Sequence, residues 1–234
     1  MVVLLTRPQA DSARIAEALN ADGIETMIWP LSRIVPLANA VSIPDGTEAV
    51  IFTSANAVRT FSTLSAERNL PAICVGVRTA QVARDAGFAD TRICGGDARS
   101  LADTVANSPM QHFFYPRGRE TATDLAEDLR CNGKIVVETI LYGSDPSGPP
   151  SEAVNEALET GRIGVITVWS RRNAEVLCRQ IIAHPGWRLA GTDLIAISQS
   201  ASEPLEETPF RRILVSPEPN ADAMKATISA ALRQ

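Results

Sequence analysis

Two parts of this sequence resemble each other, and this internal repeat constrains the fold more than any other feature. Residues 2–32 and 112–144 follow one plan: an apolar strand-like run, a polar turn, an amphipathic helix, a glycine and a second apolar run. Leu19 corresponds to Leu129 and Gly23 to Gly133, both at an offset of 110 residues. The correspondence predicts that the chain contains two copies of one unit.

Further segments extend the repeat. Residues 49–61 resemble residues 165–177, with Ser54 on Ser170 at an offset of 116, and Ile73 corresponds to Ile195 at an offset of 122. Residues 91–105 and 211–228 form a weaker fourth pair. Duplication therefore predicts ten strands that alternate with helices, five in each of two domains. Strands that alternate with helices form parallel sheets covered by helices on both faces, so we expect a doubly wound α/β fold.

Composition and charge disfavour several classes of protein. A net charge of −5 argues against a nucleic-acid surface, which needs a concentrated excess of Lys and Arg. No apolar run reaches the length of a membrane span, and the apolar residues 1–6 lack a preceding basic region, which predicts a first strand. The four cysteines and two histidines are widely spaced, so we expect no metal site and a reducing, cytoplasmic location. These residues are Cys74, Cys94, Cys131, Cys178, His112 and His184.

Polar turns follow the expected strands, and they are the candidate binding groups. In a doubly wound sheet, ligands meet the loops at the carboxyl ends of the strands, where helix amino termini present free N–H groups. Hydroxyls, backbone amides and scattered arginines at these positions suit a ligand with many carboxylates. The alternative is that such Ser, Thr and Asn residues cap helices for stability alone. The candidates are Arg7, Ser54, Asn56, Thr79, Gly95, Arg117, Gly118, Ser170 and Ser200, with Arg117 and Gly118 in an expected turn at residues 116–118.

Common cofactor and catalytic motifs are absent from the sequence. Thr6-Arg7-Pro8-Gln9 stands where a dinucleotide site would have its glycine-rich turn, and there is no phosphate-binding loop or Gly-x-Ser-x-Gly nucleophile turn. Neither histidine falls in a polar turn. We therefore expect no cofactor, and acid-base chemistry is left to Tyr, Arg, carboxylates or the substrate itself.

The order of these turns resembles the uroporphyrinogen-III synthase family over essentially the whole chain. The segments that carry the resemblance are TRP at 6–8, FTSANAV at 52–58, VGVRTAQVARDAG at 75–87, YPRG at 115–118 and NGKIVVETILY at 132–142. The resemblance implies two flavodoxin-like domains joined by a two-segment linker. One domain would hold residues 1–34 with 146–234 and the other residues 38–141, and residues 35–37 and 142–145 would be extended linkers.

The resemblance also implies an activity. Members of this family convert hydroxymethylbilane, a linear tetrapyrrole, into uroporphyrinogen III with loss of water and inversion of ring D, in haem, sirohaem, corrin or chlorophyll biosynthesis. A lyase of this kind needs no metal or cofactor, and a monomer that receives the bilane from the preceding bilane-forming enzyme is expected. The strand-end turns of both domains would face one another across one cleft.

The resemblance places a cleft tyrosine at Tyr142, whose phenol would donate a hydrogen bond to the leaving hydroxyl of the bilane. Tyr115 is the other candidate for this acid. Alternatively, the ring of Tyr142 packs at a linker and its hydroxyl only reaches water. In that case the enzyme would act by holding the substrate in the conformation that closes to the inverted isomer.

The second repeat departs from the family pattern in two places. Ser200-Ala201 stands where the family often has paired threonines, and Arg171-Arg172 follows Ser170, so cations would partly replace hydroxyls there. Ser198 and Ala201 in the first of these turns leave open a non-catalytic tetrapyrrole-binding or sensor protein with the same cleft. A flavodoxin-like electron carrier is a third possibility, but aromatic residues make up only 5% of the chain, which leaves little to stack on a flavin. An electron carrier would be coloured, whereas a cofactor-free synthase would be colourless.

Overall fold

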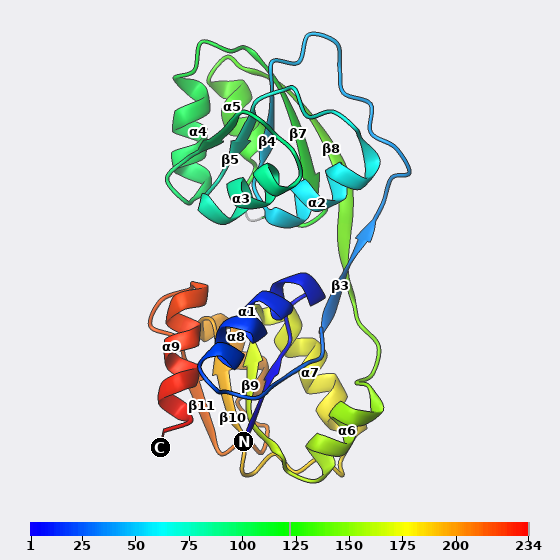
Figure 1. Ribbon diagram of the computed structural model, residues 1–234, viewed down its shortest axis with the longest axis vertical. Coiled ribbons are helices and arrows are strands. Elements are labelled where there is room, and N and C mark those ends of the chain that lie inside the picture. Colours follow the sequence, from blue (N-terminus) through cyan, green and yellow to red (C-terminus); the bar gives the residue numbers. More distant parts are fainter. Residues whose placement is uncertain (122, 234) are drawn as a thin grey trace. The chain divides into compact units, whose positions relative to one another are not determined.

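The computed structural model describes residues 1–121 and 123–233, and the chain forms two compact units. Unit 1 contains Met1–Arg33 and Asp145–Gln234, and unit 2 contains Ile34–Ser144. The chain therefore starts in unit 1, builds the whole of unit 2 and then returns to complete unit 1 (Figure 1).

Unit 1 is a five-stranded parallel sheet with helices on both faces. Its strands lie in the order β11-β10-β9-β1-β2. In chain order within the unit this is 2-1-3-4-5, the flavodoxin-like arrangement. The elements are β1 (Val2–Leu5), α1 (Gln9–Ala21), β2 (Thr26–Ile28), α6 (Glu152–Glu159), β9 (Ile163–Val168), α7 (Arg171–Ala183), β10 (Asp193–Ala196), α8 (Gln199–Ser202), the 3₁₀ turn η1 (Glu203–Leu205), β11 (Arg212–Val215) and α9 (Ala221–Ala231).

Unit 2 has the same core sheet with one additional strand. Its strands lie in the order β3-β8-β7-β4-β5-β6, and all the pairs from β8 to β6 are parallel. The elements are β3 (Ser32–Pro36), β4 (Ala49–Phe52), α2 (Ala55–Leu64), β5 (Ala72–Cys74), α3 (Val77–Asp85), β6 (Thr91–Ile93), α4 (Ala98–Ala106), β7 (His112–Gly118), α5 (Leu125–Cys131) and β8 (Ile135–Pro146). The first two residues of β3 and the last two of β8 belong to unit 1.

The two sheets correspond strand by strand. The order β2-β1-β9-β10-β11 in unit 1 matches β8-β7-β4-β5-β6 in unit 2, and these are the pairs that the repeat predicted from the sequence. The helices correspond as well: α1 and α9 cover one face in unit 1, as α5 and α4 do in unit 2. The predicted doubly wound fold is confirmed. The order along the chain differs between the units. In unit 1 the strands β1 and β2 come before β9, β10 and β11, whereas in unit 2 their counterparts β7 and β8 come after β4, β5 and β6.

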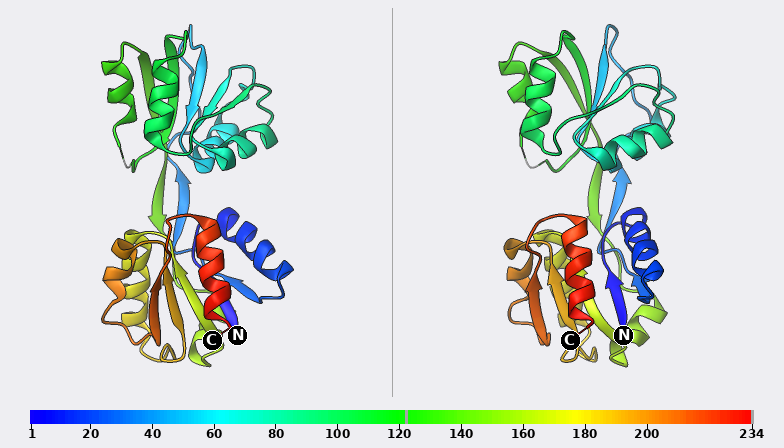
Figure 2. Two further views of the ribbon diagram at one scale, coloured as in Figure 1. Left: turned by 90° about the vertical axis from the view of Figure 1, so that its left-hand side faces the viewer. Right: turned by 60° about the vertical axis from the view of Figure 1, so that its left-hand side comes forward.

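The strands are apolar at successive positions because both faces of each sheet are buried. In β1, Val3 and Leu5 pack under α1 and α9, whereas Val2 and Leu4 pack under α6 and α7. In unit 2, α4 and α5 lie on one side of the sheet and α2 and α3 on the other (Figure 2). A fully buried parallel strand reads as a continuous hydrophobic run, which explains why these segments were visible in the sequence.

The prediction of ten strands was wrong, because the described residues form eleven. The additional strand, β3, includes part of the segment expected to be an extended linker. It pairs with the distal half of β8, which runs in the opposite direction: Leu37 N–H donates to Leu141 O at 2.8 Å and Ser147 N–H to Leu31 O at 3.0 Å. Two extended segments that lie side by side satisfy each other's backbone groups, which a lone linker would leave to water.

The turn predicted at residues 116–118 was also wrong, because these residues continue β7. They remain in the sheet because β8 runs alongside them and offers them backbone partners. Pro116 pairs with Thr139, Arg117 with Ile140 and Gly118 with Tyr142, with an irregularity in register before Gly118. The chain leaves the sheet only after Gly118, and α5 begins at Leu125.

No helix among residues 1–121 and 123–233 is long and apolar enough to cross a bilayer. The same residues contain no group of three or more His, Cys, Asp or Glu side chains that could hold a metal ion.

Candidate active site

A pocket of about 330 Å³ lies in unit 2 at the carboxyl ends of the parallel strands. It extends over the boundary between β4 and β7, where the chain order of the strands changes, and this is the usual ligand position in open α/β sheets. Hydroxyl groups and two carboxylates dominate the lining. The described lining residues are Thr53, Ser54, Val75, Gly96, Asp97, Ala98, Tyr115, Gly118, Glu120, Thr121, Thr123 and Tyr142.

Two tyrosines in this pocket are held by two consecutive residues that follow β4. Ser54 Oγ and Tyr142 Oη share a hydrogen bond of 2.7 Å, and Thr53 Oγ1 and Tyr115 Oη share one of 3.2 Å. Tyr115 comes from β7 and Tyr142 from β8, so three strands contribute to the arrangement. The prediction placed Ser54 and Tyr142 at the site separately, and the structure brings them into direct contact.

Ser54 has a second role as the N-cap of α2. Its Oγ accepts a hydrogen bond of 3.0 Å from Ala57 N–H, which satisfies one of the free amides at the start of the helix. A hydroxyl can donate one hydrogen bond and accept two. The Ser54 proton therefore remains available for Tyr142 while the helix is capped.

Both phenols are protonated near neutral pH, and burial raises their pKa values further. Burial raises the pKa of Tyr142 above 10, the hydrogen bond with Ser54 lowers it in part, and the nearby Tyr115 and Glu120 raise it. The pKa of Tyr115 is likewise raised above 10, mainly by burial, against the hydrogen bond with Thr53. Both hydroxyls are therefore hydrogen-bond donors rather than phenolates.

Gly118 gives the Tyr142 ring its space. A Cβ at this position would lie 2.9 Å from Cζ and 3.1 Å from Oη of Tyr142, closer than side chains normally approach. Gly118 lines the pocket and also allows the tyrosine to lie across the end of β7. A substrate contact at Gly118 stays a prediction.

Arg117 was expected to meet a substrate carboxylate, but the protein supplies that carboxylate itself. Its Nε donates to Glu138 Oε2 at 2.6 Å and its Nη1 donates to the carbonyl of Gly118 at 3.0 Å. Arg130 Nη2 lies 3.5 Å from Glu138 Oε1 on the same side chain. The continuation of β7 as a strand places Arg117 beside the neighbouring strand β8, where it forms this ion pair.

The other predicted residues of unit 2 lie outside the set that lines the pocket. Asn56 accepts a hydrogen bond of 2.9 Å from Arg59 Nη1 in the first turn of α2. Thr79 is only 4% exposed, because α3 starts at Val77 and the predicted turn is already helix. A Cβ on Gly95 would lie 2.6 Å from Ser100 Oγ, so this glycine permits a close approach to α4.

Sequence reasoning did not single out several lining residues. Thr53 stood in a recognised polar turn, and its position beside Ser54 was the available signal. Asp97, the N-cap of α4, and Glu120 were missed, because a search for donors to a polyanion passes over carboxylates. Hydrogen bonds from the backbone and side chain of Ser100 lower the pKa of Asp97, which is therefore ionised at neutral pH.

In unit 1, the corresponding strand ends bring an arginine and a tryptophan together. Arg7 follows β1 and its Nη2 lies 2.9 Å from Asp11 Oδ2, while its guanidinium carbon lies 4.7 Å from the centre of the Trp169 ring. Ser170 caps α7 by accepting a hydrogen bond of 3.2 Å from Asn173 N–H. β1 and β9 are neighbours, so the structure brings the ends that carry Arg7 and Ser170 together.

Two other predictions concern the turns of unit 1. Ser200 shares a hydrogen bond of 3.1 Å with Ser198 at the start of α8. Arg171, expected to replace hydroxyls with positive charge, forms ion pairs with Glu175 at 3.4 Å and with Glu203. Its charge is therefore largely neutralised within unit 1. The expectation that the turns of the two units face one another across one cleft stays a prediction.

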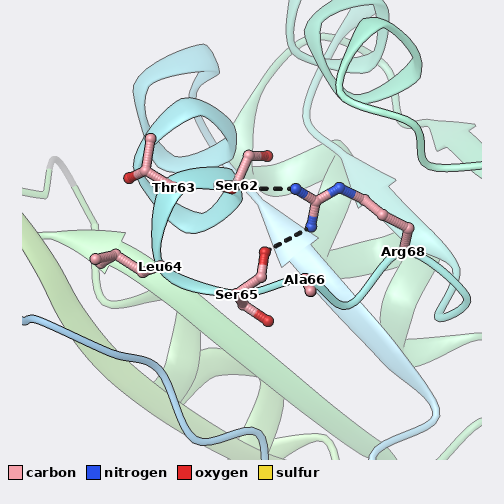
Figure 3. Close-up of a pocket in the computed structure, with 6 residues that line it drawn as sticks. All are labelled: Ser62, Thr63, Leu64, Ser65, Ala66 and Arg68. Carbon is pink, nitrogen blue, oxygen red and sulfur yellow. Dashed lines mark hydrogen bonds between the residues drawn. The ribbon is translucent and has the colours of Figure 1, made fainter.

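A second hollow in unit 2, of about 570 Å³, is lined by residues whose contacts hold the fold together. It lies at the end of α2, where the Arg68 guanidinium donates to the carbonyls of Ser62 at 3.2 Å and Ser65 at 2.9 Å (Figure 3). Its Nε donates to Ala86 O at 2.7 Å. These bonds satisfy carbonyls at the carboxyl end of the helix and tie α2 to α3.

Comparisons with known proteins agree with this architecture. Residues 13–226 match the family model described as uroporphyrinogen-III synthase HemD. A uroporphyrinogen-III synthetase from Helicobacter pylori has a similar fold, with a TM-score of 0.63 and 18% identity over 99% of each chain. A mutant uroporphyrinogen III synthase from the extremely thermophilic bacterium Thermus thermophilus has a TM-score of 0.50 and 14% identity, over 100% of this chain and 99% of that one. A comparison with curated protein sequences finds no match.

Proposed function

The chain belongs to the uroporphyrinogen-III synthase family, and from this premise we propose that it cyclises hydroxymethylbilane to uroporphyrinogen III in tetrapyrrole biosynthesis. The reaction is that of a lyase: the bilane loses water, and ring D is inverted as the macrocycle closes. The observation that carries the proposal is the family match over residues 13–226. The pocket of unit 2 supports it, because its groups suit the loss of a hydroxyl.

Tyr142 is proposed as the acid that assists the departure of this hydroxyl. Ser54 accepts from Ala57 N–H and can donate its own proton to Tyr142 Oη, which leaves the phenol proton for the substrate. The bond between the hydroxymethyl carbon and its oxygen breaks, the oxygen leaves as water with the phenol proton, and an azafulvenium cation and a phenolate remain. The phenol recovers a proton when ring closure releases one. General acid help of this kind contributes about 100- to 10,000-fold.

The two carboxylates of the pocket fit the charge that develops in this step. Loss of the hydroxyl builds positive charge on the pyrrole, and Asp97 and Glu120 line the same pocket as Tyr142. Preorganised negative charge near such a centre lowers the barrier, whereas it would repel the carboxylates of the substrate. The pocket is therefore assigned to the hydroxymethyl end of the bilane rather than to its acid side chains.

The eight carboxylates of the substrate need donors elsewhere. Hydroxyls and amides at helix starts can bind them without a net positive charge, and Ser170 and Ser200 in unit 1 are such groups. Arg7 adds a cation in the same unit. Thr79 and Arg117 fit this role less well, because Thr79 is buried and Arg117 is paired with Glu138. Holding the bilane in the conformation that closes to the inverted isomer could supply about 7–11 kcal/mol.

We further propose that the enzyme works as a monomer in the cytoplasm and receives its unstable substrate from the preceding bilane-forming enzyme. Size-exclusion chromatography with light scattering tests the monomer. Addition of unlabelled bilane to the coupled reaction tests the hand-over, since a direct transfer would resist dilution by the free intermediate.

One assay tests the proposed function. Hydroxymethylbilane is incubated with the protein, the products are oxidised, and the isomers are separated by chromatography. We expect mostly the type III isomer. Type I product alone, at the rate of the spontaneous reaction, would leave a non-catalytic tetrapyrrole-binding protein as the better account.

A further inference from the structure

The arginine at the end of β1 is held on both sides by unit 1. Its guanidinium carbon lies 4.7 Å from the centre of the Trp169 ring, and its Nη2 lies 2.9 Å from Asp11 Oδ2. The side chain of Asp11 is only 5% exposed, whereas that of Arg7 is 29% exposed. The guanidinium of Arg7 is therefore held in place by Asp11 and Trp169 and is still partly exposed to solvent.

The tryptophan under Arg7 is itself anchored. Trp169 Nε1 donates to Thr167 Oγ1 at 3.1 Å, and Thr167 Oγ1 donates to the carbonyl of Leu4 on the neighbouring strand at 3.3 Å. Thr167 is fully buried, so this connection ties the ring to the sheet. A guanidinium stacked on such a ring keeps its N–H groups at the edge of its plane, where a carboxylate can be bound in bidentate fashion.

The corresponding arginine of unit 2, Arg117, is held by an ion pair on the neighbouring strand and not by a tryptophan ring. Arg117 occupies the equivalent position at an offset of 110 and binds Glu138 on the adjacent strand at 2.6 Å. Thr53 occupies the position of Trp169, at an offset of 116, and its hydroxyl bonds Tyr115. Among the residues that the structure describes, Asp11 is the only acidic group paired with Arg7. At this strand-end position, the described residues of unit 1 therefore have an arginine over an aromatic ring and those of unit 2 do not.

We propose that Arg7 binds a carboxylate of the linear tetrapyrrole and that Trp169 is a positioning residue that holds the guanidinium for it. The proposal rests on the proposed function. The cation acts on binding and not on the loss of water, because the tyrosine acid belongs to the other unit. Weakening the stack should therefore raise KM and leave kcat nearly unchanged.

A double-mutant cycle tests the proposal on the full-length protein. Trp169→Leu removes the ring face, and we expect KM for hydroxymethylbilane to rise about 5- to 10-fold with kcat within about twofold. Arg7→Gln should raise KM about 10- to 30-fold. Trp169→Phe, which keeps a smaller ring, should recover most of the loss. The double variant should be no worse than Arg7→Gln, because Trp169 acts through Arg7.

Arg14→Gln is the matched control, because it removes an exposed cation from α1, the helix that follows Arg7; KM should change less than about twofold. Full additivity of Arg7→Gln and Trp169→Leu would overturn the proposal, because the tryptophan would then act independently of the arginine. An unchanged KM in Arg7→Gln would also overturn it. Circular dichroism confirms that each variant is folded before its kinetics are measured.

Equilibrium binding separates this proposal from the proposed function. Fluorescence titration with uroporphyrin I, an octacarboxylate, should show weaker binding to Arg7→Gln by about tenfold. Coproporphyrin I, with half as many carboxylates, should show a smaller difference. If the wild-type protein fails to make the type III isomer but this pattern holds, the proposed function fails and the carboxylate site stands. Equal affinity of the wild-type protein and Arg7→Gln for uroporphyrin I would reject the site even in an active synthase.

Discussion

The two units share a strand order but carry different chemistry at the same place in the sheet. In unit 2, the residues after β4 bind tyrosine hydroxyls, and the arginine on the neighbouring strand is neutralised by Glu138. In unit 1, the residue after β9 is a tryptophan that supports an arginine, Arg7. The buried strands had to stay apolar to preserve each core, whereas the residues just beyond them could change freely. One duplicated frame therefore carries a tyrosine pocket with two carboxylates in one unit and an arginine over a tryptophan ring in the other.

The stability of the two units should diverge most strongly at low pH. Burial alone would raise the pKa of Asp193 in β10, but hydrogen bonds and charges from Arg211 and Arg212 outweigh it and lower the pKa from 3.8 to about 2. A carboxylate with a lowered pKa stabilises the fold above its unfolded pKa, and this contribution disappears as the pH falls from about 4 to 2. Unit 1 should lose about 2 kcal/mol over this range.

Hydrogen exchange at several pH values measures this difference. The amides of β10 and β11 should lose protection below pH 4 more steeply than those of β5 and β6, since Pro71 stands in unit 2 at the position of Asp193. Equal loss in both units would show that the ion pairs of Asp193 add no stability specific to unit 1.

Replacement of Tyr142 by Phe should separate the units by function. The change keeps the ring beside Gly118 and removes only the hydroxyl that bonds Ser54. We expect kcat to fall at least about tenfold, with little change in KM. The matched variant Tyr115→Phe removes the hydroxyl held by Thr53 and should cost less, because Tyr115 is almost completely buried.

Unchanged turnover in a folded Tyr142→Phe protein would show that the hydroxyl is not the acid. Catalysis would then consist of holding the substrate in the reactive conformation. A larger effect of Tyr115→Phe would transfer the acid role to the second tyrosine of the pocket.

The two equivalent helix caps should differ in their effect on activity. Ser54→Ala and Ser170→Ala each remove an N-cap, and each should destabilise its unit by about 1 kcal/mol. Only Ser54 bonds the proposed acid, so Ser54→Ala should also lower kcat about fivefold, whereas Ser170→Ala should act mainly on KM. Denaturation curves and steady-state kinetics of both variants give the comparison. A similar loss of kcat in both would remove the special role of the Ser54 hydroxyl.

Removal of one charge from the pocket should have the smallest effect. Asp97→Asn keeps a side chain that caps α4 equally well, so stability should remain unchanged. Loss of the negative charge beside the developing cation should lower kcat about threefold, as steady-state kinetics would show. An increase in kcat would indicate that Asp97 instead repels the substrate, and the pocket would then receive a carboxylate end of the bilane.

The repeat made most of the fold predictable. Strands buried on both faces are continuous apolar runs, and equivalent helices end at equivalent glycines. Gly23 and Gly133 have φ values of +77° and +80°, as expected where α1 and α5 end. The pairing of residues 35 and 36, from the predicted linker, as part of strand β3 was not predictable in this way. Whether residues 32–36 form a strand depends on a partner more than 100 positions away, and no local signal reports it.

The same limit explains the errors at the site. Arg117 was read as part of a polar turn, because Pro-Arg-Gly is a common turn sequence. Its place in a strand follows from pairing with Ile140 of β8, the strand that also carries Glu138. The stacking of Arg7 on Trp169 joins residues far apart in the chain, so the sequence could suggest the cation but not its support.

The double passage of the chain between the units sets an order of events during protein synthesis. Residues 1–33 leave the ribosome before unit 2, yet β1 must wait for β9, its central partner, which starts at residue 163. At about 5–20 residues per second this wait lasts about 7–26 s. Meanwhile β4, the counterpart of β9, emerges well before β7, its proper neighbour. During that interval the place beside β4 that β7 will occupy is unfilled, while β1 already awaits the equivalent place beside β9.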